Sequence, residues 1–163
     1  MKDRLNDRLL RAAVMTIGMG MLWATSLPAA RADCLDDAAN YWSVPTSLAR
    51  AVAMQESGMR PRVVSKNTNG SRDIGLMQIN SSWLPRLKQY GIGEEDLLDA
   101  CKNAYVGTWI MAQNIAQLGY NWTAIGAYNA VTPSKRDAYA RKIYGQLMRL
   151  QGGATTTGPM ANQ

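Results

Sequence analysis

Apolar residues recur every three or four positions through most of this chain, in short stretches that end at glycine or proline. This spacing predicts helices over 34–42, 45–57, 94–100, 100–118, 122–129 and 137–150. It also predicts a short helix around Trp83, Leu84 and Leu87. The segment 59–72 is rich in proline, serine, asparagine and glycine, which predicts a loop. Periodicity does not decide whether 73–80 is extended or leads into a helix. A chain of 163 residues with this pattern is expected to form one mainly helical domain.

The first 32 residues have the layout of a secretory signal peptide. Basic residues come first, positions 12–30 carry no charge, and Ala30-Arg31-Ala32 is typical of a cleavage site. We expect cleavage after Ala32; the alternative is an uncleaved membrane anchor, and both place the remainder outside the cytoplasm. The predicted organisation is therefore a signal peptide at 1–32, a domain at 33–150 and a disordered tail at 151–163.

The composition excludes several kinds of chemistry. The chain has no histidine, which removes Ser-His-Asp and Cys-His nucleophile systems and zinc sites built on imidazole, and no metal or organic cofactor is expected. Without residues 1–32 it carries thirteen basic and ten acidic residues, a net charge of +3. That charge suits an anionic cell-wall polymer and is too small to indicate nucleic acid as a partner. Cys34 and Cys101 are expected to pair in an oxidising compartment, the alternative being two free thiols.

Glu56 is the residue that least fits its surroundings. It continues the apolar face of the helix predicted at 45–57, four residues after Val52 and three after Ala53. Burial and the negative end of the helix dipole both disfavour a charged carboxyl group, so the pKa of Glu56 is expected to be raised. A carboxyl that stays protonated near neutral pH can donate a proton to a glycosidic oxygen. The alternative is a structural ion pair with Arg60 or Arg62.

Three short motifs in this order resemble the soluble lytic transglycosylases, enzymes that cut peptidoglycan. The motifs are Gln55-Glu56-Ser57-Gly58, Gly75-Leu76-Met77-Gln78-Ile79-Asn80 and Ala127-Tyr128-Asn129-Ala130, with Ser65 between the first two. The likeness covers about 34–150 and is strongest to the small enzymes that accompany conjugation, type III or type IV secretion, and pilus systems. It implies a monomeric, periplasmic bacterial enzyme with a lysozyme-like α+β fold: a compact, mainly α domain with one disulfide and a short irregular or β segment beside the active site.

The resemblance also implies roles for individual residues. Glu56 matches the catalytic acid and base, Ser57 a residue that orients it, and Tyr128 a tyrosine whose hydroxyl points toward the catalytic carboxyl. Gly75 matches a glycine that permits close backbone approach. Taken from the residues alone, Tyr128 could equally be core and Gln78 a satisfied buried amide. The predicted substrate-binding set is Ser57, Gln78, Asn80, Tyr128 and Asn129.

Asp73 departs from the family pattern, which commonly has a small residue there. The stretches 67–75 and 78–81 resemble c-type lysozyme, in which the aspartate at this position is the second catalytic carboxylate. Asp73 is therefore a second candidate catalytic residue; a turn aspartate bonded to local backbone N–H groups is the alternative. A further departure is Val131, where the family usually has glycine.

The function predicted from the sequence is lytic cleavage of the bond between N-acetylmuramic acid and N-acetylglucosamine, leaving a 1,6-anhydro end. Its expected role is to open the cell wall locally for a secretion or conjugation apparatus. The expected partners are peptidoglycan strands and components of that apparatus. Two alternatives stay open: a lysozyme-type hydrolase that uses Glu56 with Asp73, and a non-catalytic module that docks a secretion system to the cell wall.

Overall fold

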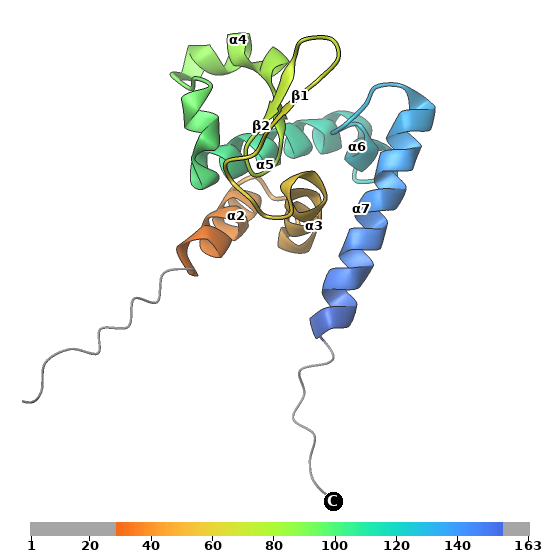
Figure 1. The fold of residues 1–163 in the computed structure, drawn as a ribbon. Helices are drawn as coiled ribbons and strands as arrows, with labels where there is room; N and C mark the ends of the chain where they lie inside the picture. The colour runs from red at the N-terminus through yellow and green to blue at the C-terminus, as the bar shows by residue number, and fades with distance from the viewer. Residues whose placement is uncertain (1–28, 155–163) are drawn as a thin grey trace, which may run out of the picture.

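The computed structural model describes residues 29–154 (Figure 1). The predicted signal peptide lies outside this range except for its last four residues, and so does most of the predicted tail. None of the helices described has the length and hydropathy that a membrane span requires.

The structure confirms a single, mainly helical domain with a small sheet. Several predicted boundaries differ. The first helix begins at Ala29 instead of Cys34, and the helix predicted over 94–100 is a short 3-10 turn, because Asp99 is the N-cap of the next helix. Pro133 begins the last helix four residues early, since proline lacks only an N–H that the first turn leaves unpaired, and residues 127–129 form a turn. The longer helices are α2 (Ala29–Tyr41), α3 (Thr46–Ser57), α5 (Ala100–Leu118), α6 (Trp122–Gly126) and α7 (Pro133–Ala154). The short ones are η1 (Ser81–Trp83), α4 (Leu84–Leu87), η2 (Lys88–Tyr90) and η3 (Glu95–Leu98).

A three-stranded antiparallel sheet occupies part of the segment predicted to be a loop. Its strands are β1 (Val64–Lys66), β2 (Arg72–Ile74) and β3 (Ile79–Asn80), in the order β1-β2-β3. The loop prediction over 59–72 was therefore wrong at β1 and at the start of β2. The three residues of β1 are all exposed, so no alternation of apolar and polar residues marks the strand. The register pairs Asp73 with Ser65 on one side and with Asn80 on the other.

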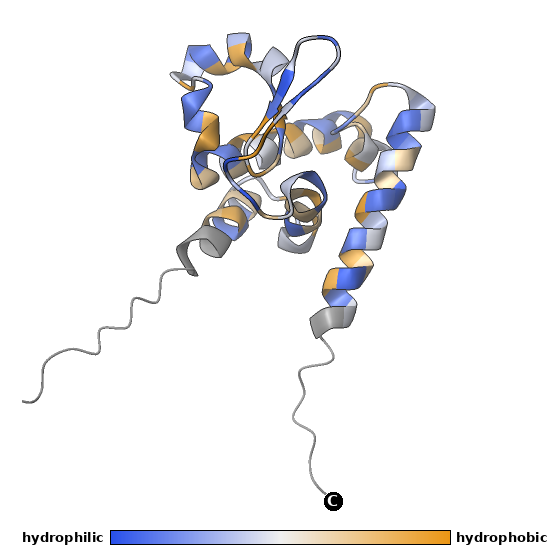
Figure 2. Cartoon of the chain, viewed as in Figure 1, coloured by the Kyte–Doolittle hydropathy of each residue, from blue (hydrophilic) through white to orange (hydrophobic). Residues whose placement is uncertain are grey.

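Helix α5 connects the parts that carry the site. It packs against α2 and α6, while α7 packs against α3 and α6. The sheet and α2 lie on opposite sides of α5 (Figure 1). The predicted inward residues of α7 are buried at Tyr139 and Ile143 and partly buried at Leu147 and Leu150. Hydrophilic and hydrophobic residues alternate along α7, as expected of a helix with one face on the core (Figure 2).

The predicted disulfide between Cys34 and Cys101 is confirmed, and it joins α2 to the first turn of α5. The cysteines are 67 residues apart in sequence. Closing a loop of this length stabilises the folded state by about 4 kcal/mol in the chain-entropy account.

Candidate active site

Glu56 is the second-last residue of α3, and its carboxyl group is half-buried. Gly58 ends the helix in the left-handed conformation, with φ +62°. Burial is the main cause that raises the pKa of Glu56, and the negative charge of Asp73 raises it further. A hydrogen bond from Tyr139 and the positive charge of Lys142 act in the opposite direction without cancelling the rise. The raised pKa expected from the sequence is therefore confirmed.

The alternative of an ion pair between Glu56 and a nearby arginine finds no support in the described residues. The Arg60 guanidinium donates from Nε to the carbonyl oxygen of Ser57 at 2.8 Å. The ion pairs within residues 34–152 join Arg50 to Asp36, Arg72 to Glu94 and Lys102 to Asp96.

Two stacked tyrosines lie beside Glu56, with ring centroids 6.4 Å apart. The Tyr139 hydroxyl donates to Glu56 Oε1, whereas the Tyr128 hydroxyl donates to the carbonyl oxygen of Met77 at 2.8 Å. The contact with Glu56 expected of Tyr128 is thus made by Tyr139, because Tyr139 of α7 faces the last turn of α3. Burial, with the charge of Glu56 adding to it, raises the pKa of both tyrosines well above 10, so both hydroxyls stay protonated as donors.

Tyr139 lies beside Glu56, and the sequence did not predict this contact, since the periodicity placed Tyr139 only among the core residues of the last helix. The signal that could have found it is the hydroxyl itself. A tyrosine on an otherwise apolar stripe needs a hydrogen-bond partner when it is buried, and a half-buried carboxyl is one of the few partners that an inward face can offer.

We expect Tyr139→Phe to lower kcat by about 10- to 100-fold, because the carboxyl of Glu56 loses the donor that orients it. The hydrogen bond from Tyr139 lowers the pKa of Glu56, so its loss raises that pKa. The decline of kcat/KM at alkaline pH should then begin at a higher pH than in the wild type. A pH series of sugar release from purified peptidoglycan measures both effects, and an unchanged profile would contradict this role for Tyr139.

The turn over residues 75–78 is tied to both neighbouring helices. Asn103 of α5 is fully buried, and its amide donates to the carbonyl oxygens of Ile74 and Leu97 at 2.8 Å each. Its oxygen accepts from the Met77 backbone N–H at 2.7 Å. From α3, the buried Ser57 hydroxyl donates to the Leu76 carbonyl oxygen at 2.7 Å. Ser57 therefore fixes the turn against α3. Within the described residues, none of the hydrogen bonds of the Ser57 hydroxyl involves Glu56.

Gly75 permits the close approach that the sequence predicts. Its φ is +81°, and a Cβ atom there would lie 2.1 Å from the carbonyl oxygen of Leu97 and 2.2 Å from Asn103 Nδ2. No side chain larger than hydrogen fits while Asn103 keeps its hydrogen bonds.

Gln78 joins the turn to β1. Its Nε2 donates to the carbonyl oxygens of Gly75 and Val63 at 2.8 and 3.0 Å, and its Oε1 accepts from the Ser65 hydroxyl at 2.9 Å. The side chain is half-buried, and these bonds match the satisfied-amide interpretation. A contact between Gln78 and sugar stays a prediction.

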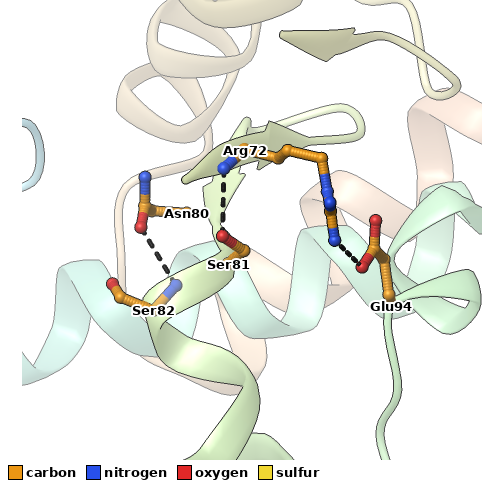
Figure 3. A network of polar contacts seen from close by, with 5 residues as sticks. All are labelled: Arg72, Asn80, Ser81, Ser82 and Glu94. Carbon is orange, nitrogen blue, oxygen red and sulfur yellow. Dashed lines mark hydrogen bonds and ion pairs between the residues drawn. The ribbon is translucent and has the colours of Figure 1, made fainter. Parts of the chain in front are cut away.

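Asp73 is held by two side-chain amides on either side of its strand. Oδ1 accepts from Asn80 Nδ2 at 2.7 Å, and Oδ2 accepts from Asn67 Nδ2 at 2.9 Å. Its neighbour Arg72 is directed elsewhere: the Arg72 side chain pairs with Glu94, and its backbone N–H donates to Ser81 Oγ at 3.0 Å (Figure 3). Neighbouring side chains on a strand point to opposite faces, so the Arg72 side chain pairs with Glu94 and not with the carboxylate of Asp73.

Asn80 has a second role besides holding Asp73, because its Oδ1 accepts from the Ser82 backbone N–H at 3.0 Å and so begins η1 (Figure 3). Asn129 is exposed in the turn that follows α6, where its backbone N–H donates to the Gly126 carbonyl oxygen at 3.2 Å. Across residues 34–152, no three acidic or cysteine side chains gather as a metal site would require.

The structure thus brings together α3, β2 and α7 around one half-buried carboxyl. The charges of Asp73 and Lys142 act on the pKa of Glu56, and its carboxyl accepts a hydrogen bond from Tyr139. Of the other predicted residues, Asn80 supports Asp73, whereas Ser57, Gln78 and Tyr128 hold the turn at 75–78.

Comparison with known proteins gives consistent relatives. The family model described as transglycosylase SLT domain matches residues 33–144. "Invasion protein IagB" of Salmonella typhimurium (strain SL1344) is 42% identical over 137 residues, which cover 81% of this chain and 86% of that protein. "Protein IpgF" of Shigella flexneri is 38% identical over 125 residues, covering 74% and 82%. "Peptidoglycan-binding-like protein" of Escherichia coli O157:H7 is 34% identical over 142 residues, covering 80% and 85%.

Proposed function

This chain belongs to the transglycosylase SLT domain family, and from that premise we propose that it is a peptidoglycan lytic transglycosylase. The observation that carries the proposal is the half-buried Glu56 carboxyl with its raised pKa, held by Tyr139 beside Asp73. Sugar release from purified peptidoglycan by residues 33–163, with a Glu56→Gln variant beside it, tests the assignment. Release that does not depend on Glu56 would contradict it.

The proposed mechanism uses Glu56 twice. Its protonated carboxyl donates a proton to the oxygen that joins N-acetylmuramic acid to N-acetylglucosamine, and the bond from C1 to that oxygen breaks. The carboxylate then takes the proton from the 6-hydroxyl of the same muramic residue as this oxygen attacks C1. The products are a free N-acetylglucosamine end and a 1,6-anhydro end. Because the closure is intramolecular, a well-positioned 6-hydroxyl can react before water does.

In this mechanism Asp73 stabilises the positive charge that develops at the sugar ring. Its carboxylate is fixed by Asn67 and Asn80, and its charge already acts on Glu56. Groups held in place before the reaction stabilise transition-state charge without reorganising. The same arrangement supports a second candidate, the lysozyme-type hydrolase, in which Asp73 attacks or stabilises C1 and water completes the reaction.

We expect Asp73→Asn to lower kcat by about a hundredfold if Asp73 only stabilises charge. The negative charge of Asp73 raises the pKa of Glu56, so its removal lowers that pKa and moves the alkaline decline of kcat/KM to lower pH. This shift is opposite to the one expected for Tyr139→Phe. Initial rates of sugar release over a pH series measure both. Full activity would remove the role, and a loss as complete as that of Glu56→Gln would favour the lysozyme-type mechanism.

We further infer that the protein is exported and works as a monomer in the periplasm, where residues 1–32 are removed and 33–150 act on the cell wall. The IagB relative is named an invasion protein, which fits local wall opening for a secretion apparatus. Fractionation of cells that produce the full chain with a C-terminal tag tests this location. Recovery in the cytoplasm would contradict it.

A further inference from the structure

One side of α7 covers the last turn of α3, where Glu56 lies. Tyr139 of α7 donates to Glu56, and Gln146 Nε2 donates to Gln55 Oε1 at 3.2 Å. Lys142 comes three residues after Tyr139 and four before Gln146, so helical spacing places it on the same side as both. Figure 1 shows α7 running beside α3. Lys142 is thus at the edge of the candidate active site.

Lys142 is exposed, and its positive charge acts on the Glu56 carboxyl. Lys135 and Arg149 lie seven residues before and after it, which is about two helical turns in each direction. Three cations therefore line one flank of α7. The acidic residue of this helix, Asp137, is five residues from Lys142 and so is turned by about 140° around the axis. This flank suits an anionic ligand.

In peptidoglycan, the candidate anions are the carboxylates of the peptide stem. The sugar backbone is uncharged, whereas the peptide stem attached to the lactyl group of muramic acid ends in free carboxylates. The lactyl group is carried by the same sugar ring whose C1 reacts, so a muramic residue with its glycosidic oxygen at Glu56 holds the start of its stem close to that carboxyl. A lysine ammonium there has three N–H donors for a stem carboxylate, and such charge-assisted bonds are among the stronger ones.

We propose that Lys142 binds a free carboxylate of the peptide stem on the muramic residue at the reaction centre, so that the enzyme prefers glycans with charged stems. This inference rests on the proposed function, because it places the scissile bond at Glu56. It assigns to α7 a part in substrate selection as well as the positioning of Glu56 through Tyr139.

The test compares two forms of the same substrate. Purified peptidoglycan is used intact and after its free carboxylates have been capped as methylamides with carbodiimide and methylamine. The measured quantity is the ratio of kcat/KM on intact to capped material, for the wild type and for Lys142→Ala. The ratio should fall by about five- to tenfold in the variant, mainly through KM. Any effect of Lys142 on the pKa of Glu56 is the same on both substrates and cancels in the ratio.

Two control variants make the result specific. Lys142→Arg keeps a donor and a charge and should retain at least half of the wild-type ratio. Arg141→Ala removes the same charge from the next residue, which is exposed and turned about 100° away, and should leave the ratio unchanged. Binding of Glu56→Gln and Glu56→Gln/Lys142→Ala to the two substrates, measured by co-sedimentation, should show the same preference without turnover.

If the wild type is active and Lys142→Ala has the same ratio of kcat/KM on intact to capped material, the proposal is wrong. An equal fall of this ratio in Arg141→Ala would also overturn it. Both results would leave the proposed function intact. A well-folded wild type that releases no sugar from either substrate would instead count against the proposed function. The co-sedimentation result would then decide the stem contact by itself, and equal binding of the two variants to intact material would overturn it.

Discussion

Sugar release from purified peptidoglycan should fall by at least about a thousandfold when Glu56 is replaced by glutamine. Glutamine has nearly the same shape as glutamate and still offers an oxygen to the Tyr139 hydroxyl, but it cannot donate the proton that the glycosidic oxygen needs. The loss should appear in kcat rather than in substrate binding. Co-sedimentation with insoluble peptidoglycan, measured beside the rate, separates the two.

The stability of Glu56→Gln is the control for this result. Because the folded-state pKa of Glu56 is raised, ionising this carboxyl disfavours the folded state once the pH rises above the ordinary range of glutamate. Glutamine does not ionise, so the melting temperature of the variant at neutral pH should equal or exceed that of the wild type. A marked fall in melting temperature together with lost activity would mean that Glu56 supports the fold instead of the chemistry.

The largest effect on stability is expected from Gly75→Ala, with a loss of about 3 to 5 kcal/mol in the free energy of unfolding. The new Cβ would meet the Leu97 carbonyl oxygen at 2.1 Å and Asn103 Nδ2 at 2.2 Å. Asn103 would have to move, leaving the partners of its buried amide without hydrogen bonds. The urea midpoint, measured with the disulfide between Cys34 and Cys101 intact, reports the change.

Gly70→Ala is a matched control for this variant. Gly70 has φ +83°, close to the +81° of Gly75, but a Cβ atom there would meet nothing within 4 Å. Its replacement should cost only the backbone strain of a left-handed alanine, about 1 kcal/mol. Equal losses at the two positions would show that the backbone conformation, rather than the close approach to α5, accounts for the requirement at Gly75.

The helices were predictable because each buries one face, and a buried face leaves a periodic trace in the sequence. Along α7 this trace placed Tyr139 and Ile143 correctly in the core. The sheet was not predictable in the same way. Its strands have three, three and two residues, and β1 buries none of them, so no pattern distinguishes them from a loop. The turn at 75–78, which joins β2 to β3, is held by residues far along the chain, Asn103 and Tyr128.

The same contrast between local and long-range features holds for the residues of the candidate site. Glu56 was identifiable because a carboxylate interrupts an apolar stripe, which is a local feature. Asp73 stood out as a departure from one family toward another. The roles of Asn103 and Tyr139 depend on partners 26 and 83 residues away, Met77 and Glu56 respectively. Local spacing carries no information on such pairings, whereas the three-dimensional structure shows them directly.

The most direct test of the proposed chemistry is mass spectrometry of the soluble muropeptides that residues 33–163 release from purified peptidoglycan, beside a Glu56→Gln control. The expected products carry 1,6-anhydro ends, each lighter by one water than the hydrolytic product, and the control is expected to release none. Reducing ends that depend on Glu56 would contradict it, and would make Asp73 the catalytic partner of a lysozyme-type hydrolase.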